Sequence, residues 1–139
     1  MSTIGRAFEI ALKAHQGQTD KAGMAYIGHV ARVAAGVAKD QEIIVALLHD
    51  VIEDCEVSLA DLEEDFPPEI VAAVNAITKR DGEDPDDYYT RVKANSLATQ
   101  VKLSDLGDNG HPARLALLDD ETRARLMTKY AHAARELRD

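Results

Sequence analysis

The sequence holds a single cysteine, no tryptophan and no long hydrophobic run. Cys55 cannot form an internal disulfide and has no CxxC partner, which excludes an oxidised scaffold and a cysteine zinc site. No apolar stretch approaches the roughly 20 residues that span a bilayer, and residues 1–6 lack the apolar segment of a signal peptide. These absences predict a cytoplasmic protein with no membrane partner.

Positive charge is also scarce. The chain has 16 Lys and Arg against 25 Asp and Glu, which gives a formal net charge of −9. Proteins that bind duplex nucleic acid normally carry a basic stripe and gain affinity by releasing counterions, so the composition argues against this class. An anionic small molecule is compatible with the sequence if metal ions or a few basic side chains offset the overall field.

The alternating pattern of half-buried strands is missing too, and apolar residues instead return every three or four positions. This pattern predicts an all-α fold, and 139 residues fit one domain with one core. We expect about seven to eight helices, over about residues 3–16, 27–38, 40–54, 59–64, 68–77, 88–95, 97–106 and 120–137. Polar segments at residues 16–23, 81–87 and 107–112 separate several of them.

One polar pair interrupts the most apolar part of the chain. His49 and Asp50 follow the apolar residues 43–48 and precede Val51 and Ile52. A buried imidazole and carboxylate cost roughly several kcal/mol unless dedicated partners satisfy them. A bound metal ion satisfies both at once, so the pair indicates a metal site.

Two further residues have ligand chemistry that suits the same ion. His29 and Asp105 lie in two other expected helices, and the four side chains form a set of two imidazoles and two carboxylates without a thiolate. Such a set suits Mn²⁺, Fe²⁺ or a similar octahedral ion better than a structural zinc. Taken singly, His29 could be a helix-start residue and Asp105 a polar residue near a helix end.

Glu53 and Asp54 form an acidic cluster one helical turn after the polar pair. At the C-terminal end of the expected helix 40–54, these charges oppose the helix dipole. A nearby cation would relieve the repulsion, although a solvated acidic helix end is the alternative interpretation.

The order of these motifs resembles that of HD-domain metal-dependent phosphohydrolases, and in detail the hydrolase domain of RelA/SpoT-type alarmone enzymes. The segments that carry the resemblance are Ala14-His15-Gln16-Gly17-Gln18, Tyr26-Ile27-Gly28-His29, Ala46-Leu47-Leu48-His49-Asp50-Val51-Ile52-Glu53-Asp54, Ile77-Thr78-Lys79 and Val101-Lys102-Leu103-Ser104-Asp105. They cover about residues 5–110, with the helix expected at about 120–137 beyond them. The resemblance implies one HD-type helical bundle over residues 1–139.

The resemblance also implies a reaction and a role for each group. The metal-ligand positions, usually for Mn²⁺ and with Fe²⁺, Co²⁺ or Mg²⁺ as alternatives, are His29, His49, Asp50 and Asp105. Glu53 and Asp54 take the positions that activate or orient a water molecule for attack on phosphorus. The family reaction removes the 3′-pyrophosphate of guanosine tetra- or pentaphosphate, so the chain resembles a stand-alone small alarmone hydrolase with a nucleotide substrate.

The substrate-binding segments depart from the family pattern. Where that pattern reads Arg-Lys-Ser-Gly, this chain has Asp20-Lys21-Ala22-Gly23, which reverses a charge beside the nucleotide. After Asp105, Leu106 replaces an arginine and Asp108 replaces a histidine, whereas Asn109 is retained. The expected substrate contacts are Lys21, Tyr26, Lys102 and Asn109, and Lys102 and Arg114 are candidate compensating cations.

Two other functions fit the same residues. One is an HD-type phosphatase or 5′-nucleotidase acting on another phosphorylated metabolite, which the altered loop permits. The other is a non-catalytic module that keeps the metal for structure or binds a nucleotide, although the presence of both Glu53 and Asp54 speaks against it. A second metal held by the other histidines, His15, His111 and His132, is a further alternative, and the sequence leaves homodimerisation open.

Overall fold

The computed structural model describes residues 3–138, which form ten α-helices and, apart from an isolated bridge between Thr19 and Ala25, no β-structure. The helices are α1 (Thr3–Ala14), α2 (Tyr26–Ala35), α3 (Asp40–Leu48), α4 (Val51–Asp54), α5 (Leu59–Glu63), α6 (Pro68–Ile77), α7 (Pro85–Lys93), α8 (Ser96–Asn109), α9 (Pro112–Leu115) and α10 (Asp120–Arg138). The all-α prediction is confirmed. Within residues 3–138, no helix has both the length and the apolar character that crossing a membrane requires.

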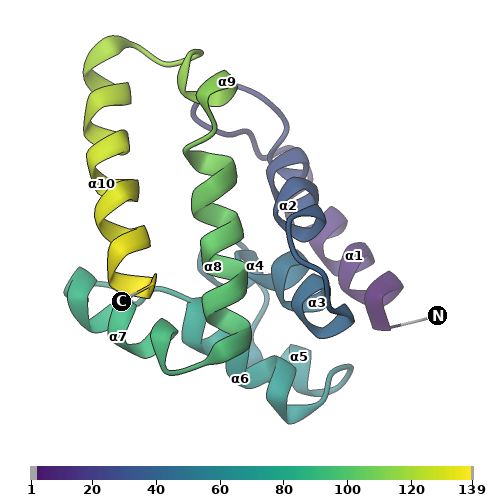
Figure 1. The fold of residues 1–139 in the computed structure, drawn as a ribbon. Coiled ribbons are helices and arrows are strands. Elements are labelled where there is room, and N and C mark those ends of the chain that lie inside the picture. Colours follow the sequence, from purple (N-terminus) through teal and green to yellow (C-terminus); the bar gives the residue numbers. More distant parts are fainter. Residues whose placement is uncertain (1–2, 139) are drawn as a thin grey trace.

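Helix α8 lies at the centre of the arrangement and contacts α2, α3, α6, α7, α9 and α10. In Figure 1, α10 runs beside α8 on one side, α1, α2 and α3 lie on the other, and α5, α6 and α7 close one end. One cluster of buried side chains joins the helices, and it includes Val30, Leu48, Leu62, Ile70 and Val101. Because each buried aliphatic side chain contributes roughly 1.5–3 kcal/mol, this core stabilises the frame that holds the polar residues described below.

The expected continuous helix over residues 40–54 is wrong, because the structure divides it into α3 and α4 at His49 and Asp50. In an unbroken helix the carbonyl of Ala46 would accept the backbone N–H of Asp50. Here it accepts the backbone N–H of His49 at 3.4 Å and the Nδ1–H of the same residue at 2.5 Å. Asp50 lies at φ −114° and ψ 0°, away from the regular helical values of about −63° and −42°, and its carbonyl accepts from Asp54 as α4 begins.

Several other boundaries also differ from the expected ones, and two of the differences have a clear local cause. Helix α7 begins at Pro85 rather than at residue 88, because Asp84 caps it by accepting from the backbone of Asp86 at 2.8 Å. Helix α8 continues through Gly107 and ends at Asn109, where the N–H of Gly110 bonds to the carbonyl of Leu106 at 2.9 Å. Packing of α8 against its neighbours outweighs the low helix propensity of one glycine.

A close approach at Gly36 fixes the distance between the end of α2 and α8. A Cβ atom at this position would overlap the Ser104 hydroxyl, which donates to the carbonyl of Val33 at 2.8 Å. The backbone at Gly36 has φ −85° and ψ −1°, which alanine adopts freely, so the only cost is steric. We therefore expect Gly36→Ala to lower the free energy of unfolding by about 1–3 kcal/mol in urea titrations, since it forces an extra atom into a packed contact.

The matched control removes the atom that alanine would meet. Ser104→Ala alone loses one hydrogen bond and is expected to cost about 1 kcal/mol. The double variant should then be more stable than the sum of the two single effects predicts, because the overlap is gone. Strict additivity of the two changes would contradict a steric origin.

Candidate metal centre

Four predicted ligands converge between α2, the α3–α4 junction and α8. His29 Nε2 lies 2.8 Å from Asp105 Oδ1, and His49 Nε2 lies 3.4 Å from the same oxygen and 3.0 Å from Asp50 Oδ2. One ligand atom each from His29, His49 and Asp105 lies within 4.8 Å of the others, and all three residues are buried. The helix break lets His49 and Asp50 face this point together, although neighbours on one helix point about 100° apart.

The ring of His49 shows that these residues are suited to bind a cation. Its Nδ1 donates to a backbone carbonyl, whereas its buried Nε2 has no hydrogen-bond partner despite the two nearby carboxylates. Burial alone would lower the pKa of His49, but Asp50 and Asp105 outweigh burial and raise this pKa well above its ordinary value. A positive charge is therefore favoured at this nitrogen, and the N/O donor set fits a divalent ion there.

Asp105 has more hydrogen-bond partners than Asp50, the other carboxylate of the group. Its Oδ2 accepts from Lys102 Nζ at 2.9 Å, and its Oδ1 also accepts from Asn109 Nδ2 at 3.2 Å. Burial would raise the pKa of Asp105, but the charge of Lys102 and the bonds from His29 and His49 hold this pKa well below its ordinary value. The carboxylate is thus kept ionised, as a metal ligand must be.

Asp50 is held by a hydrogen bond from the hydroxyl of Tyr26, one turn before His29 on α2. Burial raises the pKa of Tyr26, and the charge of Asp50 raises it further, so the phenol keeps its proton and remains a donor. Burial opposes ionisation of Asp50 as well, but the charge of His49 lowers the pKa of Asp50 to about 2.

A cavity of about 200 Å³ opens from these ligands and includes Glu53 and Asp54 in its wall. Burial, followed by the charge of Asp50, raises the pKa of Glu53 above its ordinary value. The same two causes raise the pKa of Asp54, whose carboxylate also lies 3.5 Å from the amide nitrogen of Gln18. Two carboxylates with raised pKa values beside a cation site are suited to accept a proton near neutral pH.

The same cavity is lined by cations that the sequence did not indicate as site residues. Lys79 and Lys129 line the cavity with Lys102, together with Tyr88, Tyr89 and Tyr130. The pKa of Lys79 is lowered by burial and by the charges of Lys102 and Lys129, and that of Lys129 by burial and by Lys21 and Lys102. Mutual repulsion of this kind is relieved by an anion in the cavity. Lys79 is the last residue of the motif segment Ile77-Thr78-Lys79, whereas Lys129 lies on α10 and has no local sequence signal.

The remaining predicted substrate contacts divide between two hollows. Asn109 and Tyr26 border both the metal-side cavity and a second cavity of about 270 Å³, which Lys21, Asp20 and Arg114 also line. Lys21 therefore lies in the second cavity and does not line the first. These two residues and Tyr130 of α10, which also lines both cavities, place the cavities next to each other.

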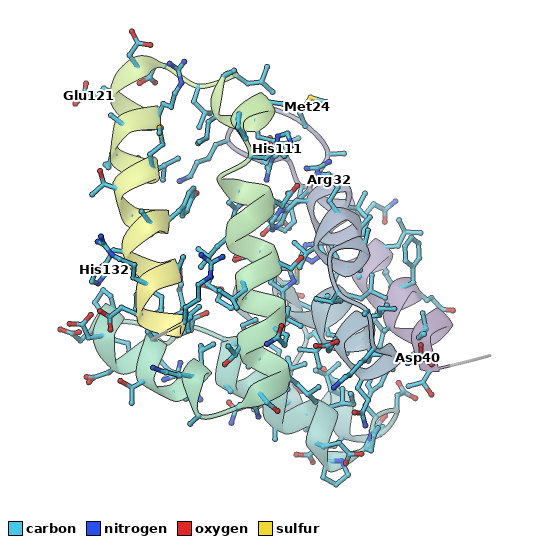
Figure 2. All side chains as sticks on the ribbon, viewed as in Figure 1. Met24, Arg32, Asp40, His111, Glu121 and His132 are labelled. Carbon is cyan, nitrogen blue, oxygen red and sulfur yellow. The ribbon has the colours of Figure 1, made fainter. Side chains whose placement is uncertain are left out.

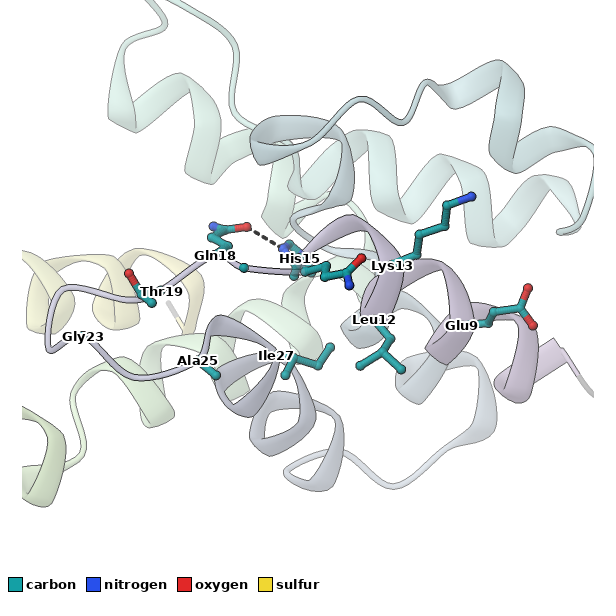
Figure 3. Close-up of a pocket in the computed structure, with 11 residues that line it drawn as sticks. Glu9, Leu12, Lys13, His15, Gln18, Thr19, Gly23, Ala25 and Ile27 are labelled. Atoms are coloured by element: carbon teal, nitrogen blue, oxygen red, sulfur yellow. Dashed lines mark hydrogen bonds between the residues drawn. The ribbon is translucent and has the colours of Figure 1, made fainter.

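The other histidines do not assemble with the four ligands in residues 3–138. His15 bonds to the Gln18 side chain at 2.8 Å, His111 caps α9, and His132 lies on α10 3.5 Å from Asp86. Figure 2 shows His111 and His132 far apart on the molecule. Figure 3 shows His15 and Gln18 in another hollow of about 700 Å³, bounded by α1, the following loop and the start of α2. Among the described residues, the ligand cluster of His29, His49 and Asp105 is the candidate metal group.

Most of the residues described above match a known protein family. Residues 7–102, well over half of the chain, match the profile of a family described as HD domain. The chain belongs to the HD domain family. Three of the four candidate ligands of this HD domain lie within the matched residues, and Asp105 follows three positions later.

Curated relatives of this HD domain include two proteins named guanosine-3′,5′-bis(diphosphate) 3′-pyrophosphohydrolase. The Vibrio cholerae protein is 39% identical over 85 residues, which cover 58% of this chain and 12% of the relative. The Aquifex aeolicus protein is 35% identical over 118 residues, which cover 76% of this chain and 17% of the relative. The chain thus spans less than a fifth of the length of either relative.

A solved structure shares the fold of this HD domain over nearly its whole length. It is described as a metazoan ortholog of SpoT that hydrolyses ppGpp and plays a role in starvation responses. The two structures align with a TM-score of 0.73 at 22% sequence identity, covering 99% of this chain and 93% of the other. The predicted HD-type helical bundle is confirmed.

Proposed function

We propose that this chain is a metal-dependent nucleotide (pyro)phosphohydrolase that removes the 3′-pyrophosphate of guanosine 3′,5′-bis(diphosphate). One observation carries the proposal: three of the four cation ligands, two carboxylates with raised pKa values and three lysines line one cavity. This combination suits attack of water on an anionic phosphorus centre. The names of the Vibrio cholerae and Aquifex aeolicus relatives support the choice of substrate.

His29, His49, Asp50 and Asp105 would hold the cation, for which we propose Mn²⁺. When bound, the cation withdraws charge from a phosphoryl oxygen and lowers the pKa of a water molecule at the site. The unpartnered Nε2 of His49 supports this assignment, because it is a buried donor atom aimed at two carboxylates. Tyr26 keeps Asp50 oriented through its hydroxyl.

Glu53 and Asp54 would take the proton of the attacking water. Their raised pKa values bring them closer to neutrality, where a carboxylate becomes a better base. Lys79, Lys102 and Lys129, which line the same cavity, would neutralise the phosphates. Lys21 and Asn109 would contact the nucleotide in the adjoining cavity.

A second candidate, hydrolysis of another phosphorylated metabolite, is favoured by the state of Asp20. Where the alarmone hydrolases have arginine, this carboxylate bonds to Arg114 at 2.8 Å and to the backbone of Ala22 at 2.9 Å. Position 20 therefore offers no free cation to a guanine nucleotide.

The deciding experiment incubates the protein with Mn²⁺ and guanosine 3′,5′-bis(diphosphate) and separates the products by chromatography. We expect GDP and pyrophosphate, with product formation lost in EDTA. Orthophosphate released only from other nucleotides would select the second candidate. Binding of Mn²⁺ without turnover of any nucleotide in the panel would select the non-catalytic module.

Two further expectations belong to the same proposal. We propose that residues 1–139 act as one phosphohydrolase domain and that the protein works in the cytoplasm. Homodimerisation is a separate question, which sedimentation of the purified protein would answer.

A further inference from the structure

Asp108, near the C-terminal end of α8, lies directly behind a candidate metal ligand. Its Oδ2 is 2.6 Å from His29 Nδ1 and 2.8 Å from Arg114 Nη1, and its Oδ1 accepts from Arg32 Nε at 2.8 Å. The Asp108 side chain is only 10% exposed, although two of its partners are cations. Both carboxylate oxygens are therefore committed to orienting neighbours rather than to solvent.

The bond to His29 determines which ring nitrogen faces the metal centre. Nδ1 of His29 lies 2.6 Å from the Asp108 carboxylate and, at the longer distance of 3.3 Å, from Arg114 Nη1; because a carboxylate oxygen only accepts, the shorter contact requires the proton on Nδ1. The other nitrogen, Nε2, lies 2.8 Å from Asp105 Oδ1, where a bound cation would take the place of the proton that this contact holds. A carboxylate on the outer nitrogen of a metal-binding histidine fixes the tautomer and ring orientation and makes the inner nitrogen a stronger ligand.

Arg114, next to α8 on α9, ties Asp108 to two other parts of the site. Its guanidinium donates to Asp20 at 2.8 Å and to Asn109 Oδ1 at 3.1 Å, in addition to Asp108. Asn109 in turn donates to Asp105, so the contacts of Arg114 reach two candidate ligands, His29 and Asp105. Figure 2 shows Arg32 at the same end of the molecule as His111, the residue that caps α9.

The same contacts link two departures from the alarmone-hydrolase pattern. Asp20 stands where that pattern has arginine and Asp108 where it has histidine, 88 positions apart in the chain. Both carboxylates bind the one guanidinium of Arg114. Arg114, which also donates to Asn109, therefore connects the two positions at which the chain departs from that pattern.

We infer that Asp108 is a positioning residue of the metal centre, which holds the Nδ1–H form of His29 and aims its Nε2 at the cation. Arg114 and Asp20 keep Asp108 in place. The inference rests on the proposed metal site, and its test therefore measures binding of Mn²⁺ rather than activity.

The test compares Asp108→Asn with the wild-type protein by calorimetric titration with MnCl₂, after circular dichroism has verified the fold. We expect the variant to bind Mn²⁺ about 10–100-fold more weakly, the loss typical of an altered outer partner. Asp61→Asn is the matched control, because it removes an equal charge from outside the metal-side cavity. The Asp61 carboxylate lies on α5 and accepts a hydrogen bond from the backbone N–H of Ser58. The affinity of this control should equal that of the wild type, and Asp20→Asn should lose less than Asp108→Asn.

The outcomes separate the inference from the proposed function. If the wild-type protein binds no Mn²⁺, the metal site itself is wrong. If the wild type binds and folded Asp108→Asn binds equally well, only the role of Asp108 is wrong. Should Asp108→Asn fail to fold, nitrogen NMR of histidine-labelled wild-type protein loaded with Zn²⁺ decides: a protonated Nδ1 on His29 supports the inference, and a metal-bound or deprotonated Nδ1 overturns it.

Discussion

Replacing Glu53 by Gln and Asp54 by Asn together should reduce kcat by about 100–10,000-fold while the protein still folds and binds Mn²⁺. The amides keep the size of the carboxylates but cannot accept the proton of an attacking water. Both residues line the metal-side cavity, and neither belongs to the proposed ligand set. Steady-state kinetics on whichever nucleotide the wild type turns over would give the loss, and titration with MnCl₂ would give the affinity.

The control for this pair is Glu63→Gln with Glu64→Gln. These two side chains are exposed at the end of α5, outside the metal-side cavity, so the change in charge is equal and the site is untouched. We expect wild-type kinetics from the control. Full turnover in the Glu53/Asp54 variant would remove both residues from the mechanism, whereas loss of Mn²⁺ binding would reassign them to the ligand shell.

Asp105→Ala should be the most destabilising single change at the site. The substitution leaves the buried Lys102 without its 2.9 Å partner, and it removes an acceptor shared by His29 and Asn109. Breaking a buried ion pair from one side costs about 3–5 kcal/mol, because an uncompensated charge stays inside the protein. Urea unfolding in EDTA, where no metal contributes to either protein, would measure the loss.

A second variant separates the unpaired charge from other consequences of losing Asp105. Lys102→Met removes the ammonium but keeps a long apolar side chain against Tyr88, whose ring lies 5.5 Å from the Lys102 nitrogen. The double variant should recover part of the stability that Asp105→Ala loses. If adding Lys102→Met destabilises the protein further, the isolated lysine is not the cause.

The helical class could be predicted from the sequence because the three- and four-residue spacing of apolar residues reflects burial directly. Ser58 shows a local signal of the same kind, because serine is a preferred N-cap residue: it accepts from Asp61 N at 3.1 Å and caps α5. The break between α3 and α4 has no such signal. It depends on one imidazole bonding to the Ala46 carbonyl, a contact that forms only once His49 is packed in place.

The candidate site likewise contains residues that the sequence predicted and contacts that it did not. The order of motifs predicted His29, His49, Asp50 and Asp105 as one group, and the structure brings them together. The bond between His29 and Asp108 could not be predicted, because it joins residues 79 positions apart and depends on how α2 docks against α8. Lys129 was missed because a lysine on a polar helix looks like any solvated charge until α10 is placed beside the cavity.

Helix α10 forms one side of both cavities, yet it lies outside the residues that match the HD domain profile. Part of the surface that would recognise the phosphates, including Lys129, therefore sits on a separate stretch of polypeptide from the groups that would perform the reaction. Changes confined to α10 can reshape the opening or its charge while leaving every candidate ligand untouched. Selection can thus retune which molecule this scaffold accepts without rebuilding the apparatus that cleaves it.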